Sequence, residues 1–297
     1  MTADRYAEVW DLLVEDLKNG RCIPFLGAGV SAEHLPLGGR LAAKWAEKLG
    51  CDLPGARNLS TVMQFGATMR FGDGTRLKQA FVDEEFSRAT TPSAADRYPL
   101  HALLAKYPLP LYVTTNYDDF MYLALRQQDK EPERDLCQWF SRDPEDWTAS
   151  PFRSARYAPT AKRPLVFHLH GHHSLPQSLV LTDDDYIDFG ARLADGTQNT
   201  TLNRGSGVQV LPREVRRMLR TMPILFLGYS LSDWNLLVLF RTLTRDLSHS
   251  QMREHISVQM LRPQLTETER EYTNRYFEAQ KIRVLWETPE SLIQRLV

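Results

Sequence analysis

The stretch "CIPFLGAGVS", residues 22–31, joins a short apolar run to a glycine-rich turn, and the interpretation of the whole chain depends on it. The run Cys22–Leu26 predicts a buried strand, and Gly27 and Gly29 allow the backbone after it to approach another group closely. Such a turn binds phosphate when free backbone N–H groups and the Ser31 hydroxyl donate to phosphate oxygens. A purely structural bend has the same composition, so the rest of the chain must decide between the two.

Apolar runs alternate with segments of helical periodicity along the whole chain. Strands are expected at 22–26, 110–114, 163–171, 224–227, 255–261 and 281–287, and helices at 3–17, 41–49, within 60–106, at 182–192, from about Asp233, at 266–279 and from Pro289. This alternation favours a parallel sheet with helices on both faces. We expect an α/β, Rossmann-like fold in a single domain spanning 1–297, with insertions at about 50–106 and 129–163.

The charge balance excludes some classes of partner. Of the 297 residues, 36 are Lys or Arg and 37 are Asp or Glu, which gives a formal net charge of −1 and no global positive field for nucleic acid or anionic lipid. No window holds the ~18 continuous apolar residues that a membrane span needs, and residues 1–16 do not resemble an export signal. We expect a cytoplasmic protein without direct membrane contact.

The cysteines argue against disulfides and structural zinc. Cys22, Cys51 and Cys137 are an odd number and form no CxxC pair. A disulfide framework needs paired cysteines, and a four-cysteine zinc site needs one more than the chain has. No metal is expected.

Polar clusters stand directly after four of the expected strands. The candidate ligand-binding residues in them are Gly27, Ala28, Gly29, Val30 and Ser31; Thr114, Thr115, Asn116 and Asp118; His170; and Gly228, Tyr229, Ser230 and Asp233. In open parallel sheets, ligands bind beyond the carboxyl ends of the strands. We therefore expect the four clusters to converge on one ligand.

Two of these clusters also fit a structural role. In "TTNYDD", residues 114–119, Thr, Asn and Asp are favoured helix caps, but Asn116 is also suited to hold a ribose hydroxyl or a water, and Asp118 to face a cationic nicotinamide. In "GYSLSD", Ser230 or Ser232 would cap the next helix and Asp233 would complement its dipole, although a ligand can use the same donors. Both interpretations stay open.

The four histidines of "HLHGHH", residues 168–173, allow three interpretations. His168 and His170 share one face of a strand, so a two-histidine metal site is sterically feasible, but the chain has neither HExxH nor paired cysteines to complete it. A packed or exposed set without chemistry is the second interpretation. The third, which we favour, is a single catalytic histidine, His170, at the end of its strand.

The order GAGVS, TTNYD, HLHG and GYS resembles the sirtuin-like (SIR2-like) Rossmann family over about residues 20–240. The resemblance implies NAD as substrate, with Gly27, Ala28, Gly29 and Ser31 at the phosphates, Asn116 and Asp118 at the ribose and nicotinamide, Gly228 and Ser230 at the ribose or phosphate, and His170 as general base. Protein-deacetylating members carry a GxPDFR stretch and a zinc module. Here "AEHLPLGGRLAAKW" replaces the first, and Thr115 replaces a glutamine, so deacylation is not expected.

Within that family, the TTNYD, HLHG and GYSxxD forms are similar to those of bacterial anti-phage NAD hydrolases. This implies cleavage of NAD+ to nicotinamide and ADP-ribose, a homo-oligomer, and a separate sensor or ATPase partner of the HerA-like or Argonaute-like kind through which nucleic acid would act. The alternative is a non-catalytic module that binds NAD or ADP-ribose. Hydride transfer is disfavoured because Glu47, at the distance expected for a ribose-binding acid, falls in a predicted helix.

Overall fold

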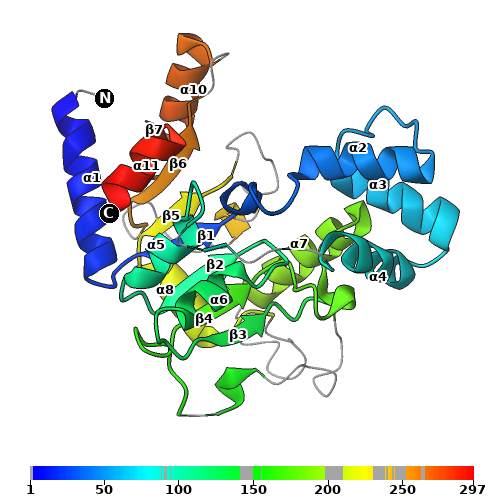
Figure 1. The fold of residues 1–297 in the computed structure, drawn as a ribbon, viewed down its shortest axis with the longest axis horizontal. Helices are drawn as coiled ribbons and strands as arrows, with labels where there is room; N and C mark the ends of the chain where they lie inside the picture. Colours follow the sequence, from blue (N-terminus) through cyan, green and yellow to red (C-terminus); the bar gives the residue numbers. More distant parts are fainter. Residues whose placement is uncertain are drawn as a thin grey trace.

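A fully parallel sheet forms the centre of the computed structural model (Figure 1). The structure describes residues 3–87, 89, 92–93, 95–140, 150–154, 156–197, 210–229, 238, 240–242, 244, 252–261 and 265–297. The strands are β1 Ile23–Leu26, β2 Leu111–Thr114, β3 Glu133–Leu136, β4 Leu165–His168, β5 Ile224–Leu227, β6 His255–Met260 and β7 Ile282–Glu287. Their order, β3-β4-β2-β1-β5-β6-β7, puts β1 where the chain changes direction across the sheet, and a ligand crevice forms at such a switch point.

Helices surround this sheet. They are α1 Ala3–Lys18, α2 Gly38–Leu49, α3 Leu59–Gly66, α4 Gly74–Glu85, α5 Leu100–Lys106, α6 Phe120–Arg126, α7 Asp183–Thr197, α8 Arg213–Thr221, α10 Glu267–Glu278 and α11 Pro289–Leu296, with a 3-10 turn η1 at Ala28–Ser31 and a π turn η2 at Ala67–Phe71. Thr288 caps α11 by accepting from the Ser291 N–H, with Pro289 in the first turn, as predicted. Of the helix expected from about Asp233, the structure describes only 238, 240–242 and 244, and these residues are helical.

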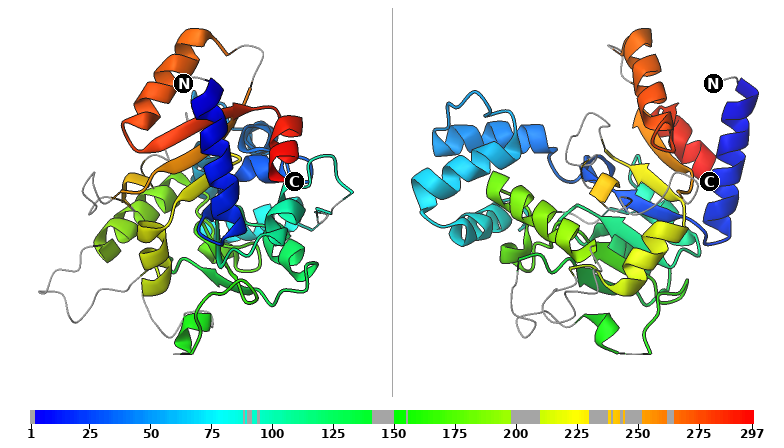
Figure 2. Two further views of the ribbon diagram at one scale, coloured as in Figure 1. Left: turned by 90° about the vertical axis from the view of Figure 1, so that its left-hand side faces the viewer. Right: turned by 180° about the vertical axis from the view of Figure 1, so that it is seen from behind.

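Both faces of the sheet are buried, which explains why its strands read as continuous apolar runs. Phe25 of β1 belongs to a core formed with α7, α8 and α10, whereas its neighbour Leu26 belongs to the core formed with α1, α5, α6 and α11. Figure 2 shows α1 and α11 on the same side of the sheet, near both chain termini, and the two helices are in contact. The expected α/β fold with helices on both faces is confirmed.

The helices α2, α3 and α4 form a separate lobe beside the sheet (Figure 1). Its core contains Trp45, Met63 and Phe81, which are fully buried, and it packs against Leu179 and Leu181 from the segment that follows β4. Within the range 50–106, α3 and α4 belong to the lobe together with α2, whereas α5 covers the sheet. The lobe stands next to the strand ends that carry the polar clusters.

The segment 129–163, expected as an insertion, contributes the edge strand β3. Its sequence "ERDL" is charged and pairs only with β4, with register Leu136 opposite His168. An edge strand buries less surface than a central one, so it needs no apolar run. The sequence pattern could not reveal it for this reason.

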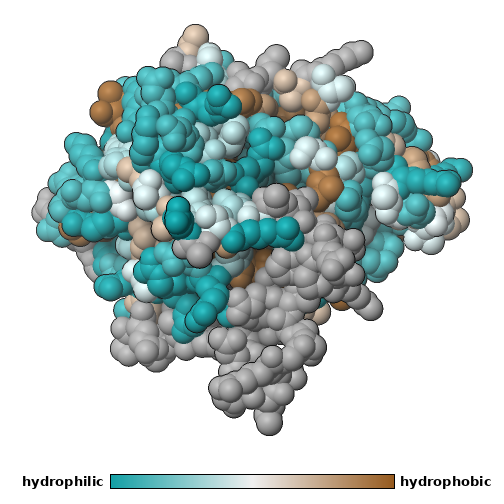
Figure 3. Space-filling model, turned by 90° about the horizontal axis from the view of Figure 1, so that it is seen from below, coloured by the Kyte–Doolittle hydropathy of each residue, from teal (hydrophilic) through white to brown (hydrophobic). Residues whose placement is uncertain are grey.

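The described surface is mostly polar. In the view of Figure 3 hydrophilic residues dominate, and hydrophobic ones form small separate patches. Within the described part of the chain, no helix combines the length and the apolar character needed to cross a bilayer. The three cysteines are free and buried, each in a different core.

Candidate active site

The register of the sheet brings the polar clusters to one level. Leu26 of β1 pairs with Thr114 of β2 and with Leu227 of β5. Thr114 in turn pairs with His168 of β4. The residues that follow these four positions therefore leave the sheet at the same height, at the switch point beside β1.

The glycines of this edge are required by close backbone contact. A Cβ atom on Gly29 would lie 2.8 Å from the Gly228 Cα, and one on Gly27 would lie 2.8 Å from the Gly228 carbonyl oxygen. Gly228 itself has a φ of +74°, and a Cβ there would lie 2.5 Å from the Val30 nitrogen. The turns after β1 and β5 thus pack directly on each other, which only residues without a side chain permit.

This packing uses N–H groups that the sequence suggested were free for phosphate. The Gly29 N–H donates to the Gly228 carbonyl over 2.9 Å, and the Val30 N–H donates to the Gly27 carbonyl over 3.1 Å. The Gly27 N–H donates to Leu227 over 2.9 Å. The expectation of free donors is therefore wrong for these three N–H groups, because β5 and the turn after it accept from Gly27 and Gly29, and Gly27 accepts from Val30 within the first turn.

Asn116 and Asp118 are tied to the first turn through Ser31. The Asn116 side-chain amide donates to the Gly27 carbonyl over 3.1 Å and to the Ser31 hydroxyl over 3.2 Å. The Ser31 hydroxyl donates to Asp118 Oδ2 over 3.1 Å. This chain of hydrogen bonds fixes the loop after β2 against the turn after β1, as the convergence hypothesis requires.

Asp118 is a buried carboxyl group with a perturbed pKa. Asp118 is 6% exposed, and this burial raises its pKa to about 6. Hydrogen bonds from the Phe120 N–H and the Ser31 hydroxyl lower the pKa, but by less than burial raises it. The bond from the Phe120 N–H, 3.0 Å, also gives Asp118 part of the capping role at α6. The structural and functional interpretations of this residue are therefore compatible.

Thr114, Thr115 and Tyr229 converge on a single carbonyl, that of Leu26. It accepts from the Thr114 hydroxyl over 3.2 Å, the Thr115 N–H over 3.0 Å and the Tyr229 hydroxyl over 3.0 Å. The Thr115 and Tyr229 hydroxyls are also 2.7 Å apart. Thr115 and Tyr229 line the cavity described below, whereas Thr114 and Gly27 lie behind its wall.

His170 follows β4 and faces the same cavity from an apolar setting. It is 8% exposed, with the Phe189 and Tyr186 rings of α7 edge-on at 5.0 and 5.6 Å between centroids. Burial lowers its pKa to about 3, so the imidazole is neutral at physiological pH. Ser230 and Asp233 lie outside the described residues.

These residues enclose a cavity of about 1230 Å³. Its wall includes Ala28–Ser31, Thr115, Asn116, Asp118, His170, Gly228 and Tyr229, and the lobe completes it with Phe81, Glu85 and Phe86. Small-molecule sites usually have volumes of ~300–1,000 Å³. The space therefore suits an extended ligand of dinucleotide size.

Two further wall residues have no motif in the sequence. Tyr186 of α7 bounds the imidazole of His170, and Gln259 of β6 donates to the Tyr229 carbonyl over 3.1 Å. The polar Gln259 inside the apolar run "HISVQM" was the available signal for this second position. Tyr186 gave no signal, because an aromatic residue in an amphipathic helix usually packs in the core.

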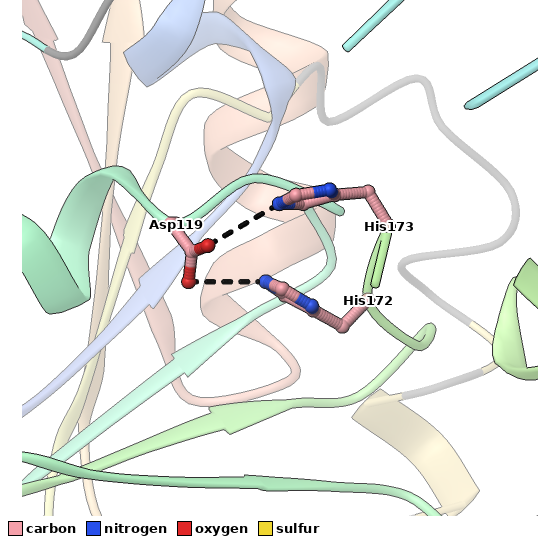
Figure 4. A group of neighbouring side chains, drawn as sticks. All are labelled: Asp119, His172 and His173. Carbon is pink, nitrogen blue, oxygen red and sulfur yellow. Dashed lines mark hydrogen bonds and ion pairs between the residues drawn. The ribbon is translucent and has the colours of Figure 1, made fainter. Parts of the chain in front are cut away.

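Asp119, His172 and His173 form a second polar group beside the site (Figure 4). One ligand atom from each lies within 4.8 Å of the others, a spacing that a metal ion can use. Two contacts favour an ion pair instead. The Arg134 guanidinium lies 2.6 Å from Asp119 Oδ1, and the Ser174 N–H donates to His172 Nδ1 over 3.1 Å, which leaves the proton of the neutral ring on Nε2, facing the carboxylate.

The two-histidine site weighed from the sequence is not what the structure assembles. His168 Nδ1 lies 3.1 Å from the Asn116 carbonyl oxygen, to which it donates, and His170 is held between aromatic rings. The histidines that approach a carboxylate are His172 and His173, after the turn at Gly171. Side-chain alternation along a strand does not apply there, because β4 ends at His168.

Fold and site together define an α/β protein of Rossmann type with one cavity at the switch point of its sheet. A family model described as the SIR2-like domain matches residues 110–285, more than half of the chain. The chain belongs to this family. The matched range holds three of the four polar clusters, and the structure places the fourth, Gly27–Ser31, against them.

Curated relatives share a single description. The chain is 28% identical over 234 residues to NAD(+) hydrolase ThsA of Acinetobacter baumannii, covering 76% of this chain and 40% of the relative. It is 25% identical over 251 residues to the protein of that name from Bacillus cereus, covering 84% and 45%. It is 24% identical over 225 residues to the Enterococcus faecium protein of the same name, covering 75% of this chain and 40% of the relative. The chain thus spans less than half the length of these relatives.

Proposed function

We propose that the chain is an NAD+ hydrolase that cleaves the bond between nicotinamide and ribose, giving nicotinamide and ADP-ribose. The observation that carries this proposal is the single cavity in whose wall Asn116, Asp118 and His170 meet beside the turns after β1 and β5. The relatives named NAD(+) hydrolase support the choice of substrate. NAD is the substrate in this proposal, and no metal takes part.

Binding would use the polar edge of the sheet. Ala28, Ser31 and Tyr229 line the cavity on the side of β1 and β5 and are the proposed contacts of the phosphates and a ribose. Asp118 is proposed to face the pyridinium end of the substrate. A cation at that position favours the ionised carboxylate and offsets the cost of its burial.

Cleavage would depend mainly on orientation and charge. Nicotinamide leaves as a neutral molecule, so no acid has to protonate it, and the protein has to stabilise the positive ribose centre that remains. Asn116 would hold a ribose hydroxyl or the attacking water, and His170, kept neutral by its aromatic surroundings, would accept the proton. Positioned proton transfer of this kind contributes ~10²- to 10⁴-fold to a rate.

One observation favours a second candidate function, a module that binds NAD or ADP-ribose without turnover. The pKa of His170 is lowered by burial alone, with no carboxylate raising it. A general base works best when its pKa lies near the operating pH. Because His170 is a weak base, the site is as well suited to holding a nucleotide without reaction as to cleaving it.

The cellular setting is part of the proposal and rests on the family resemblance. We infer a cytoplasmic, homo-oligomeric effector that depletes NAD in anti-phage defence, activated by a separate HerA-like or Argonaute-like partner that contacts nucleic acid. Size measurement by light scattering on the purified chain tests the oligomer. NAD levels in infected cells, with and without the gene, test the defence role.

The proposed activity is tested by chromatography of NAD incubated with the purified chain, alone and after forced oligomerisation. We expect equal amounts of nicotinamide and ADP-ribose to appear. His170→Ala should lower the rate by ~10²- to 10⁴-fold while calorimetry still detects NAD binding. Cleavage by His170→Ala at the wild-type rate contradicts its role, and tight NAD binding without release in any assembly supports the binding module.

A further inference from the structure

The chain turns back sharply just after His170. Gly171 has a φ of +88°, and a Cβ atom there would lie 2.2 Å from the Ser178 carbonyl oxygen. The turn sends His172 and His173 toward the loop after β2, which carries Asn116 and Asp118. The position of His170 is therefore linked to whatever holds these two histidines.

Asp119 holds both of them. Its Oδ1 lies 3.1 Å from His172 Nε2 and its Oδ2 lies 3.2 Å from His173 Nε2 (Figure 4). The Arg134 guanidinium of β3 lies 2.6 Å from Oδ1. We call Asp119, Arg134, His172 and His173 the Asp119 clasp. Although Asp119 directly precedes α6, its side chain makes no capping hydrogen bond to that helix.

The clasp pairs the negative carboxylate of Asp119 with the positive guanidinium of Arg134. Burial alone would raise the pKa of Asp119, but hydrogen bonds from His172 and His173 and the charge of Arg134 hold it far below its usual value. The carboxylate is therefore ionised at physiological pH. His172 is fully buried, its Nδ1 accepts from the Ser174 N–H, and its Nε2 lies 3.1 Å from Asp119 Oδ1.

Backbone contacts join the same two loops. The His173 N–H donates to the Tyr117 carbonyl over 2.9 Å, and the Tyr117 hydroxyl donates to the Val180 carbonyl over 2.6 Å. The Val180 N–H donates to the His170 carbonyl over 2.9 Å. The loop after β2 thus contacts His173 directly and is linked to His170 through Val180.

We propose that Asp119 is a positioning residue: through His172 and His173 it fixes the His170 loop against the loop that carries Asn116. This inference rests on the proposed function for its catalytic consequence. It concerns side chains outside the first contact with substrate, since none of the four clasp residues lines the described cavity. Misplacement of a reacting group by ~1 Å costs ~10²-fold in rate, so loosening the clasp should lower kcat.

The test uses Asp119→Asn in the full chain, which keeps the side-chain shape and removes the charge. We expect kcat for NAD cleavage to fall by ~10- to 100-fold and KM to change by less than ~3-fold, since the substrate contacts remain. Hydrogen exchange should accelerate in peptides covering 169–175 and stay unchanged in β1 and β5. Asp16→Asn is the matched control, because Asp16 is also a partly exposed carboxylate paired with an arginine, Arg21, at 3.1 Å.

His173→Gln is a milder second variant in case Asp119→Asn does not fold, because it removes one contact of a residue that is partly exposed. For this variant we expect a smaller fall in kcat and a smaller acceleration of hydrogen exchange at 169–175. The inference is overturned if hydrogen exchange at 169–175 stays unchanged. It is also overturned if kcat falls and KM rises by similar factors while hydrogen exchange changes throughout the sheet. If the wild type cleaves no NAD, the proposed function fails, and the exchange comparison alone decides whether Asp119 holds the loop.

Discussion

The buried carboxyl of Asp118 allows a quantitative prediction. Its pKa is about 6 in the folded chain against an ordinary value of 3.8, so folding favours its protonated form. The difference corresponds to about 3 kcal/mol of stability lost at high pH. This loss is absent below about pH 4, grows as the pH rises through 6, and is complete by pH 8.

Asp118→Asn removes the charge and keeps the shape. The Asn oxygen can still accept from the Phe120 N–H, now 3.0 Å from Asp118 Oδ1, while the bond from Ser31 has to reorganise at a cost of about 1 kcal/mol. We therefore expect the variant to be about 2 kcal/mol more stable than the wild type at pH 8. Its nicotinamide release should fall sharply, because the charge proposed to face the pyridinium is gone.

The pH dependence separates this effect from other consequences of the substitution. Between pH 8 and pH 5 the wild type recovers about half of this loss through protonation of Asp118, whereas the variant recovers nothing at this position. The advantage of the variant should shrink by that amount, as measured by urea denaturation at both pH values. An advantage that is equal at pH 5 and pH 8, or larger at pH 5, would refute the reasoning, and Asp16→Asn gives the effect of losing a partly exposed carboxylate.

Two further substitutions test the packing of the site. Gly228→Ala should destabilise the chain by about 2 kcal/mol or more, because Gly228 has a left-handed conformation and a Cβ there would lie 2.5 Å from the Val30 nitrogen. The control is Gly190→Ala in α7, where a Cβ has open space, and it should stabilise the chain by about 0.5–1 kcal/mol. Thermal unfolding compares the two, and equal shifts contradict the packing role. Lys78→Met should lower the free energy of unfolding by about 3 kcal/mol, because it removes the ammonium that lies 2.6 Å from the mostly buried Asp185 carboxylate. Denaturant unfolding measures this cost, and a loss below about 1 kcal/mol would show that the buried pair is not needed.

The class of fold and the main site residues followed from local patterns in the sequence. A run such as "PILFL" before Gly228 and the alternation of runs with amphipathic segments are local properties, since burial on both faces dictates the composition of each strand separately. The clusters after the strands were readable for the same reason. β3 was missed because an edge strand with sequence "ERDL" carries no such signal.

The contacts between segments far apart in the chain could not be predicted from local patterns. The N–H of Gly29 looked free until the Gly228 carbonyl accepted from it, and Asp119 looked like a helix cap until Gly171 turned two histidines toward it. Local composition and periodicity were enough to predict most of the strands and helices and the polar groups that follow four of the strands. Strand order, register and the placement of the α2–α4 lobe decided their partners, because hydrogen bonds and ion pairs depend on distances in space that local composition does not encode.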